Sequence, residues 1–208
     1  SINEQNNEFE IKTSDGTVTK IIFYRSDIFR IWVGPNGQLT DPASEEETPI
    51  VVYDDNPIRV NQSEENDYYK IESDAIVLRI YKNPCMFSLY KKDNYTLLFE
   101  ENKPITYGAE TYQSINRHSD DYFYGCGMQN GHFCHNDRNI QIENIYDDTQ
   151  NIWNEHGTPN AVSFYMSLKG YGVFRNTYEG GTYEFQSTVK TTHKENRFDA
   201  YYFVGSLK

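Results

Sequence analysis

Short runs of β-branched and aromatic residues recur along the whole chain, each bounded by glycine, proline, asparagine or aspartate. Such runs are typical of β-strands. In residues 75–81, Ile76, Leu78 and Ile80 fall on one face, which is the alternation of a half-buried strand. No comparable run has helical spacing, so we predict an all-β fold, a large antiparallel two-sheet β-sandwich with little helix. The expected strands are 18–24, 28–33, 49–53, 75–81, 86–91, 95–100, 161–167, 170–174, 182–186 and 200–204.

The length of 208 residues suits one large β domain, and we expect residues 1–208 to form a single domain. The polar stretches 41–49 and 61–69 carry charge without apolar periodicity, so they are expected to be solvated loops rather than linkers. The longest region without clear strand patterns runs from about 107 to 160. Loops of that length inside a domain are usually functional or cover something.

The net charge of −12, from 19 basic and 31 acidic residues, argues against nucleic acid and acidic membranes as partners. No window approaches 18 consecutive apolar residues, and the first residues, SINEQNNEFE, lack the pattern of a signal peptide. The cellular location stays open. Aromatic residues make up 15% of the chain, although the mean hydropathy is −0.78. This composition fits strands with one buried face and surfaces that stack on sugars.

The stretch YFYGCGMQNGHFCHNDRNI, residues 122–140, contains four possible metal ligands in Cys126, His132, Cys134 and His135. Their spacing does not match the paired ligands of structural zinc sites, and no helix start or cationic cluster marks an activated thiol. We therefore expect no metal or other cofactor here, but buried cysteines and hydrogen-bonded histidines. The glycines fit no phosphate loop, and they favour a bulge or tight turns at a sheet edge.

The segment IWNEHGTPN, residues 152–160, combines an aromatic, an amide, a carboxylate and an imidazole with turn-forming residues. Such a loop tip can hydrogen-bond hydroxyl groups and stack on a sugar ring. Alternatively, its tryptophan anchors the loop in the core. The candidate substrate-binding residues are Trp153, Asn154, Glu155 and His156. Carboxylates are plentiful elsewhere, but the sequence does not place two of them at the separation that glycoside hydrolysis needs.

Five stretches together resemble the N-terminal β-sandwich domain of glycoside hydrolase family 31, the family of α-glucosidases, α-xylosidases, α-glucan lyases and α-glucosyltransferases. The resemblance spans nearly the whole chain, and its most specific pieces are YGCGMQNG and AVSFYMSLKGYGVFRNT. The stretches are 23–34, 87–105, 122–133, 153–181 and 197–205.

The resemblance implies a galactose-mutarotase-like sandwich whose catalytic aspartates lie in a (β/α)8 barrel expected downstream. Neither aspartate motif is present, so no residue is assigned a catalytic role and the chain alone is expected to be inactive. In relatives, an Asn-x-Asp-like loop lines the substrate subsites. Asn154, Glu155 and His156 match that loop, with Glu155 or His156 where relatives carry aspartate.

Three functions remain in competition. The first is a non-catalytic N-terminal domain that packs on the barrel of its own polypeptide and lends a loop to α-linked glucan or oligosaccharide subsites. The second is a free-standing carbohydrate-binding module. The third is an aldose epimerase, which needs a general acid and a general base across a sugar ring.

Overall fold

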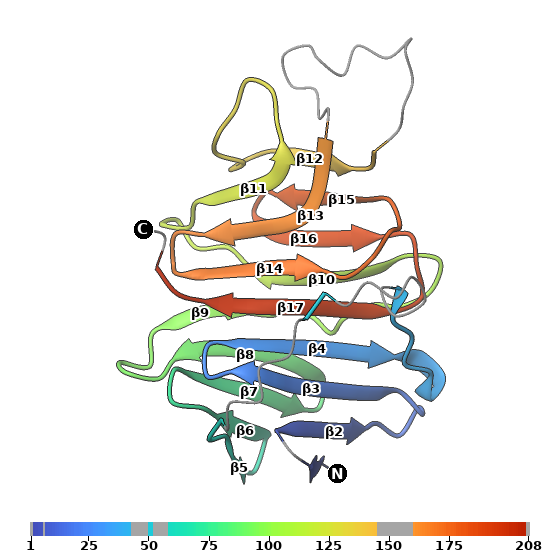
Figure 1. Cartoon of the computed structure of the whole chain (residues 1–208), viewed down its shortest axis with the longest axis vertical. Helices are drawn as coiled ribbons and strands as arrows, with labels where there is room; N and C mark the ends of the chain where they lie inside the picture. The colour runs from blue at the N-terminus through green and yellow to red at the C-terminus, as the bar shows by residue number, and fades with distance from the viewer. Residues whose placement is uncertain (1, 6, 43–49, 52–57, 145–159, 207–208) are drawn as a thin grey trace.

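The computed structural model describes residues 2–5, 7–42, 50–51, 58–144 and 160–206, and its regular structure is almost entirely β-strand (Figure 1). The all-β prediction is confirmed. One short 3-10 turn, η1 (Pro35–Gly37), follows the fourth strand. The strands are β1 (Ile2–Gln5), β2 (Glu8–Lys12), β3 (Val18–Arg25), β4 (Ile28–Gly34), β5 (Asn61–Glu64), β6 (Tyr68–Glu72), β7 (Ile76–Lys82), β8 (Cys85–Lys91), β9 (Leu97–Glu100), β10 (Thr111–Asn116), β11 (Phe123–Met128), β12 (Asn139–Ile142), β13 (Asn160–Ser167), β14 (Tyr171–Arg175), β15 (Gly181–Phe185), β16 (Thr188–His193) and β17 (Phe198–Val204).

The strands form two packed layers. An eight-stranded sheet, the large sheet, has the order β1-β2-β3-β4-β17-β14-β13-β11 and makes one layer. The second layer contains a five-stranded sheet, β5-β6-β7-β8-β9, and a four-stranded sheet, β10-β16-β15-β12. An isolated bridge between Glu101, just after β9, and Ile115 of β10 joins these smaller sheets side by side. Both lie behind the large sheet in Figure 1, so the expected antiparallel sandwich is present.

Aromatic side chains from both layers meet in the core. Phe99 of β9 stacks on Tyr202 of β17 with ring centroids 5.4 Å apart, and Phe123 of β11 stacks on Phe185 of β15 at 5.1 Å. All four are buried, and burial of such a side chain stabilises the fold by roughly 1.5–3 kcal/mol. The Tyr202 hydroxyl donates a hydrogen bond to Gln113 Oε1 at 3.0 Å. Part of the high aromatic content therefore fills the space between the layers.

Every expected strand except 49–53 is present, with ends within two residues of the prediction. Of that exception, only Ile50 and Val51 belong to the described residues, and neither lies in a strand. The expected loop 41–49 also falls mostly outside the described residues. No helix in the described part of the chain is long and apolar enough to cross a membrane.

Two sequence-based expectations are wrong. The region from 107 to 160 was expected to lack strands, yet it contains β10, β11 and β12. Residues 61–69 were expected to be a solvated loop, yet β5 and the start of β6 lie there. These strands are rich in asparagine, glutamine, glycine or charge, which are residues of low β-propensity. Pairing with apolar neighbours overrides that weak local preference.

Candidate functional site

The glycine-rich part of residues 122–140 forms β11 at the edge of the large sheet. Gly125, Cys126 and Gly127 have φ values of 109°, 60° and 79°, in the region that favours glycine. The register with β13 shifts between Gly125 and Gly127, which marks a β-bulge. The prediction of a bulge at a sheet edge is therefore confirmed. A Cβ on Gly127 would lie 2.2 Å from the backbone oxygen of Asn160, so β13 approaches too closely for any side chain.

Two side chains after β11 hold the bulge in shape. His135 Nε2 lies 2.9 Å from the carbonyl oxygen of Gly125, and the His135 backbone N–H donates to the carbonyl of Phe123 at 2.9 Å. Asn136 Oδ1 accepts from the Phe123 N–H, and its Nδ2 donates to the carbonyl of Asp121 at 2.6 Å. Burial lowers the pKa of His135, which favours a neutral ring. For His135, the predicted hydrogen-bonded role is confirmed.

The cysteines of this stretch have the environments of structural residues. Cys126 is fully buried, and burial raises the pKa of its thiol, which disfavours the nucleophilic thiolate. Cys134 is half-buried, with its Sγ 3.4 Å from Asn136 Oδ1. Among the described residues, no group of three or more histidine, cysteine, aspartate or glutamate side chains is placed to hold a metal ion. The stretch therefore shapes the end of the sheet.

Next to the bulge lies the base of the segment predicted to contact substrate. Asn144, just after β12, and Ala161, at the start of β13, are joined by two hydrogen bonds. Asn144 Oδ1 accepts from the Ala161 N–H at 2.7 Å, and Asn144 Nδ2 donates to the Ala161 carbonyl at 2.9 Å. This paired contact fixes the two ends of the segment at one end of the sandwich (Figure 1). Outside the described residues lie the four predicted substrate-binding residues, Trp153, Asn154, Glu155 and His156.

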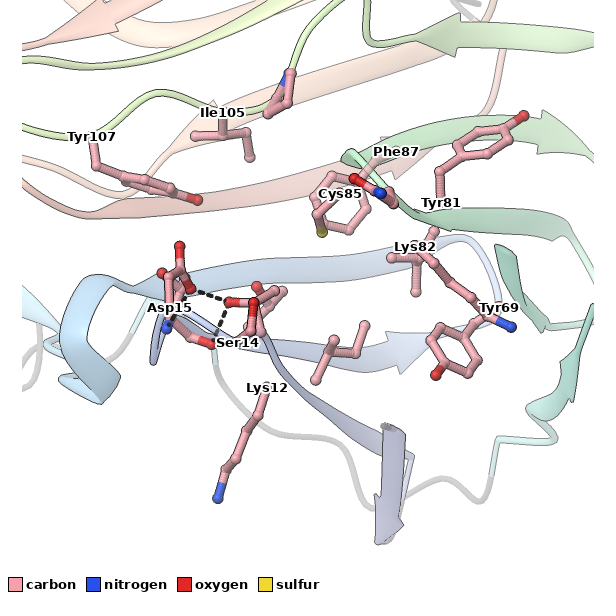
Figure 2. Close-up of a pocket in the computed structure, with 17 residues that line it drawn as sticks. Lys12, Ser14, Asp15, Tyr69, Tyr81, Lys82, Cys85, Phe87, Ile105 and Tyr107 are labelled. Atoms are coloured by element: carbon pink, nitrogen blue, oxygen red, sulfur yellow. Dashed lines mark hydrogen bonds between the residues drawn. The ribbon is translucent and has the colours of Figure 1, made fainter. Parts of the chain in front are cut away.

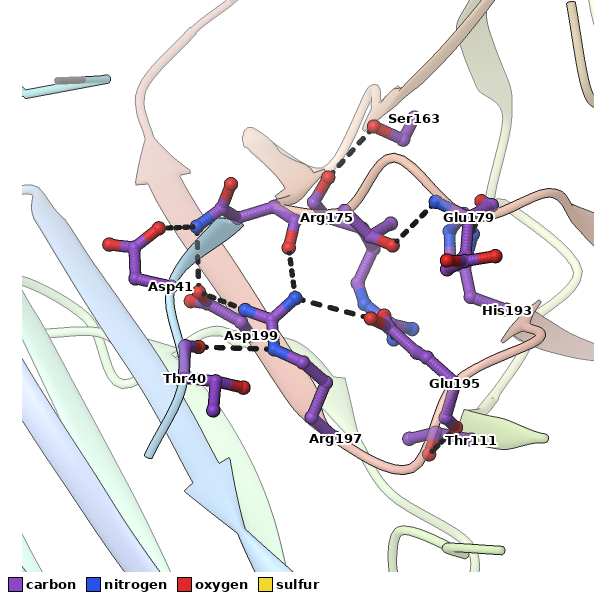
Figure 3. Close-up of polar contacts among 12 residues, drawn as sticks. Thr40, Asp41, Thr111, Ser163, Arg175, Glu179, His193, Glu195, Arg197 and Asp199 are labelled. Carbon is purple, nitrogen blue, oxygen red and sulfur yellow. Dashed lines mark hydrogen bonds and ion pairs between the residues drawn. The ribbon is translucent and has the colours of Figure 1, made fainter. Parts of the chain in front are cut away.

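A cluster of charged side chains lies on the outer side of the large sheet, where β4, β17 and β14 are neighbours. Figure 3 draws Asp41, Arg197 and Asp199 of this cluster. Asp199 is its central acceptor. Arg30 donates to Asp199 Oδ1 at 2.7 Å through Nε and to Oδ2 at 2.6 Å through Nη2. Asn176 and Arg197 each donate to Oδ2 at 2.7 Å. Asp41 accepts from Arg30 at 3.0 Å and from Asn176 at 2.9 Å.

The Asp199 cluster links distant parts of the chain, and the sequence analysis missed it. Burial opposes the charge on Arg30, but the hydrogen bonds and charge of Asp199 outweigh burial and raise the pKa of Arg30. Arg30 and Asp199 are 169 positions apart, so no local pattern connects them. A signal was nevertheless available, since each stands alone as a charge in an otherwise apolar strand. Buried charges of this kind need a partner.

A second polar group lies between the layers. Arg175 is fully buried, with its guanidinium 4.3 Å above the ring of Phe198. Its Nη1 donates to the carbonyl and the hydroxyl of Thr191 at 3.2 and 3.3 Å, and its Nη2 lies 3.8 Å from Glu195 Oε1. Burial raises the pKa of Glu195, partly offset by the charges of Arg175 and Arg197. This group ties β14 to β16 and to the turn before β17.

His193 lies beside this group and has both ring nitrogens engaged. Its Nδ1 lies 2.9 Å from the carbonyl of Glu179, so Nδ1 is the donor, and Nε2 accepts from the Tyr183 hydroxyl at 3.0 Å. Burial, with a smaller effect of nearby arginine charge, lowers the pKa of His193 to about 3. The ring is neutral and fully buried, so it has no nitrogen available for proton transfer to a ligand.

A cleft of about 560 Å³ opens between the layers at the β2–β3 and β7–β8 turns (Figure 2). Its inner wall is largely apolar and includes Ile80, Phe87 and Ile105. Cys85 also lines it, and burial raises the pKa of that thiol to about 11. Tyr107 points its hydroxyl towards the cleft. The cleft has the form of a ligand pocket but no set of converging charged groups that would define a reaction.

The fold and the sequence identify the class of domain. Residues 18–184 match the family described as the glycosyl hydrolase 31 N-terminal galactose mutarotase-like domain. The chain therefore belongs to this family. No curated protein matches the chain at a significant level.

Solved structures of glycoside hydrolase 31 enzymes share the fold. A dextranase from Flavobacterium johnsoniae, in complex with isomaltotriose, superposes with a TM-score of 0.86 at 17% identity, over 99% of this chain and 26% of that chain. The cycloalternan-forming enzyme from Listeria monocytogenes, with a pentasaccharide substrate, gives 0.76 at 17% identity, over 99% and 20%. An α-xylosidase from a soil metagenome, with xylose, gives 0.76 at 18% identity, over 99% and 32%. The chain thus spans a fifth to a third of the length of these enzymes.

Proposed function

We propose that this chain is the single, non-catalytic N-terminal domain of a family 31 enzyme that acts on α-linked glucans or oligosaccharides. In this proposal, residues 1–208 pack on the catalytic barrel of the same polypeptide and lend one loop to the substrate subsites. The observation that carries the proposal is the match of residues 18–184 to the family's N-terminal domain. Support for the substrate class comes from the dextranase and the cycloalternan-forming enzyme, whose structures hold isomaltotriose and a pentasaccharide.

The loop proposed to contact substrate is the segment that contains Trp153, Asn154, Glu155 and His156. The Asn144–Ala161 pair supports this role, because a loop whose ends are fixed loses less conformational freedom when it binds. The bulge of β11 lies at the same end of the sandwich and brings β11 close to the start of β13, where this segment ends. Asparagine, glutamate and histidine can hydrogen-bond sugar hydroxyls, and tryptophan can stack on a sugar ring.

An epimerase function is not favoured by the described residues. Such an enzyme needs a general base and a general acid within reach of a sugar. His193 is buried with both nitrogens engaged, and Glu195 is held between Arg175 and Arg197. His193 therefore has no free nitrogen for a ligand, and the carboxylate of Glu195 faces two arginines.

Substitution of the loop should change substrate preference in the full-length enzyme. Glu155→Gln and His156→Ala are each expected to shift kcat/KM on short relative to long α-glucans, or the ratio of transfer to hydrolysis. Loss of one hydrogen bond to a sugar hydroxyl costs about 0.5–1.5 kcal/mol, or about 1.5–3 kcal/mol for a charged partner. The expected change is therefore about two- to hundredfold. Steady-state kinetics on a series of maltooligosaccharides and isomaltooligosaccharides measures it.

The matched control is Glu65→Gln, which makes the same chemical change in an exposed turn between β5 and β6. Its kinetic constants should equal those of the wild type. If both loop variants also match the wild type on every substrate while remaining folded, the loop has no role in the subsites and that part of the proposal is wrong.

The 208-residue chain alone is expected to show no turnover of maltose, isomaltose or an aryl α-glucoside. The physical reason is that neither aspartate motif of the family's barrel is present in this sequence. Product release by the purified chain, measured against a mock purification, should not exceed the background rate. Turnover above that background would contradict the non-catalytic assignment.

A further inference from the structure

The outer face of the large sheet is apolar over β13, β14 and the end of β17, although this face lies on the side away from the sandwich core. An antiparallel sheet with one buried face ordinarily alternates apolar residues inside with polar residues outside. Here most outward positions of β13, β14 and β17 are also apolar or aromatic, with Asp199 and Asn160 as the polar exceptions. Figure 1 looks onto this side of the large sheet. We define the aromatic face as Tyr124, Val162, Phe164, Met166, Phe174 and Phe203.

The strand register makes the aromatic face continuous. Phe164 of β13 lies directly opposite Phe174 of β14. One pair further along, Met166 lies opposite Gly172, which in turn lies opposite Phe203 of β17. The rings of Phe164 and Phe203 are in edge contact, with centroids 6.3 Å apart. These side chains therefore form one patch across neighbouring strands rather than scattered apolar residues.

Part of this face is open to solvent in the domain. Val162 is 42% exposed and Phe203 is 37% exposed, whereas the other members are partly buried against one another. Beside the face, the ring of Phe133 is 85% exposed and packs on Tyr124 with centroids 5.0 Å apart. Contiguous exposed apolar patches of this kind mark sites of protein interaction.

Charge is kept away from this face. The chain has 31 acidic residues, yet on β4, β17, β14, β13 and β11 the outward positions hold only Arg30 and Asp199 as charged residues. Those two are buried and paired with each other. The buried cores of protein interfaces are likewise rich in aromatic residues and poor in charged residues.

The face has a hollow at its edge, where β14 begins and β17 ends. Gly172 contributes no side chain, and a hollow of about 190 Å³ lies beside it, lined also by Phe164, Met166 and Phe203. A Cβ added to Gly172 would lie 3.1 Å from the ring of Phe164. A hollow with apolar walls can receive one apolar side chain from a partner, as in the anchor pockets at the centres of interfaces.

We propose that the aromatic face is the surface on which the catalytic domain of the same polypeptide packs, with one of its apolar side chains in the hollow at Gly172. This assignment rests on the proposed function. Residues 204–206 line the hollow, so in a longer chain the residues that follow begin beside it. A second copy of this chain is a poorer occupant, because each copy carries a net charge of −12 and the two would repel each other.

The test is cysteine labelling of the full-length enzyme. Val162→Cys and Phe203→Cys place a thiol on the aromatic face, and Glu110→Cys places a control thiol in the exposed loop before β10. Each variant is treated with a maleimide, and the labelled peptide is quantified by mass spectrometry, which separates it from the native cysteines. Both face variants are expected to label roughly tenfold more slowly than the control, or slower still, because the contact must open first.

Equal labelling rates at the face and control positions would overturn the proposal. Protection that disappears on dilution would also overturn it, because it would identify a second copy as the occupant. Two face positions are used so that a folding defect in one variant does not decide the result.

The outcome of the labelling test is separable from the test of the proposed function. If the face labels rapidly but Glu155→Gln still alters substrate preference, the loop assignment stands and the packing surface lies elsewhere.

Discussion

Asp199→Ala is expected to lower the free energy of unfolding by about 3–5 kcal/mol, the range for removing one partner of a buried ion pair. Asp199 is buried and accepts hydrogen bonds from Arg30, Asn176 and Arg197. Its loss leaves two buried guanidinium groups without their main acceptor. Arg30 would retain Asp41, and Arg197 would retain Glu195, so neither guanidinium would be left without an acidic partner.

Urea unfolding followed by tryptophan fluorescence or circular dichroism measures this loss. Asp93→Ala, in the exposed turn between β8 and β9, is the matched control and is expected to change stability by less than about 0.5 kcal/mol. Asp199→Asn should lie between the two, because an amide oxygen can still accept hydrogen bonds but brings no charge. An Asp199→Ala variant as stable as the control would show that the Asp199 cluster does not support the fold.

The sequence predicted the fold well where local preference and tertiary packing agree. The strand over residues 75–81 was recognisable because its apolar residues alternate and turn residues bound it, and β7 lies there. β16 was missed, because TVKTTH has no large apolar residue. Thr191 accepts hydrogen bonds from Arg175, and the strand pairs with β10 and β15, so the partners that stabilise it come from elsewhere in the chain.

The same contrast between local preference and tertiary packing explains which parts of the candidate site could be predicted from the sequence. The bulge in residues 122–140 was predictable, because closely spaced glycines indicate local backbone conformations that other residues rarely adopt. The Asp199 cluster was not predicted, because it depends on which strands become neighbours. The aromatic face is an intermediate case. In runs such as AYYFV and SFYM, apolar residues do not alternate with charged ones, which is the pattern of strands buried on both faces. Aromatic content alone, however, also fits surfaces that stack on sugars. The strand register was needed to show that these residues form one surface.

Glu101 is the second position where a large effect is expected, and its environment is unusual. The side chain is buried at the junction of the two smaller sheets, and among the described residues it forms no ion pair with a basic side chain. Its Oε1 accepts from Gln113 Nε2 at 2.7 Å, and its Oε2 accepts from the Phe87 N–H at 2.9 Å. Burial outweighs these hydrogen bonds and raises the pKa of Glu101 from 4.5 to about 8. The folded protein therefore holds a proton on Glu101 that the unfolded chain releases near pH 4.5.

The contribution of Glu101 to the stability of the protein should consequently fall as pH rises from about 4.5 to 8. Between these values the native state binds more protons than the unfolded state, so the free energy of unfolding decreases with pH, and above pH 8 the loss is complete. Glu101→Gln removes this titration. Its amide oxygen can accept from the Phe87 N–H, and its amino group can donate to Gln113 if that amide turns.

Urea unfolding of the wild type and Glu101→Gln at a series of pH values tests this. The variant is expected to gain stability relative to the wild type by on the order of 3–5 kcal/mol between pH 4 and pH 9. Glu65→Gln is the control for removing an exposed carboxylate, and it should follow the wild type at every pH. A parallel pH dependence in Glu101→Gln and the wild type would mean that Glu101 ionises near its ordinary pKa despite its burial.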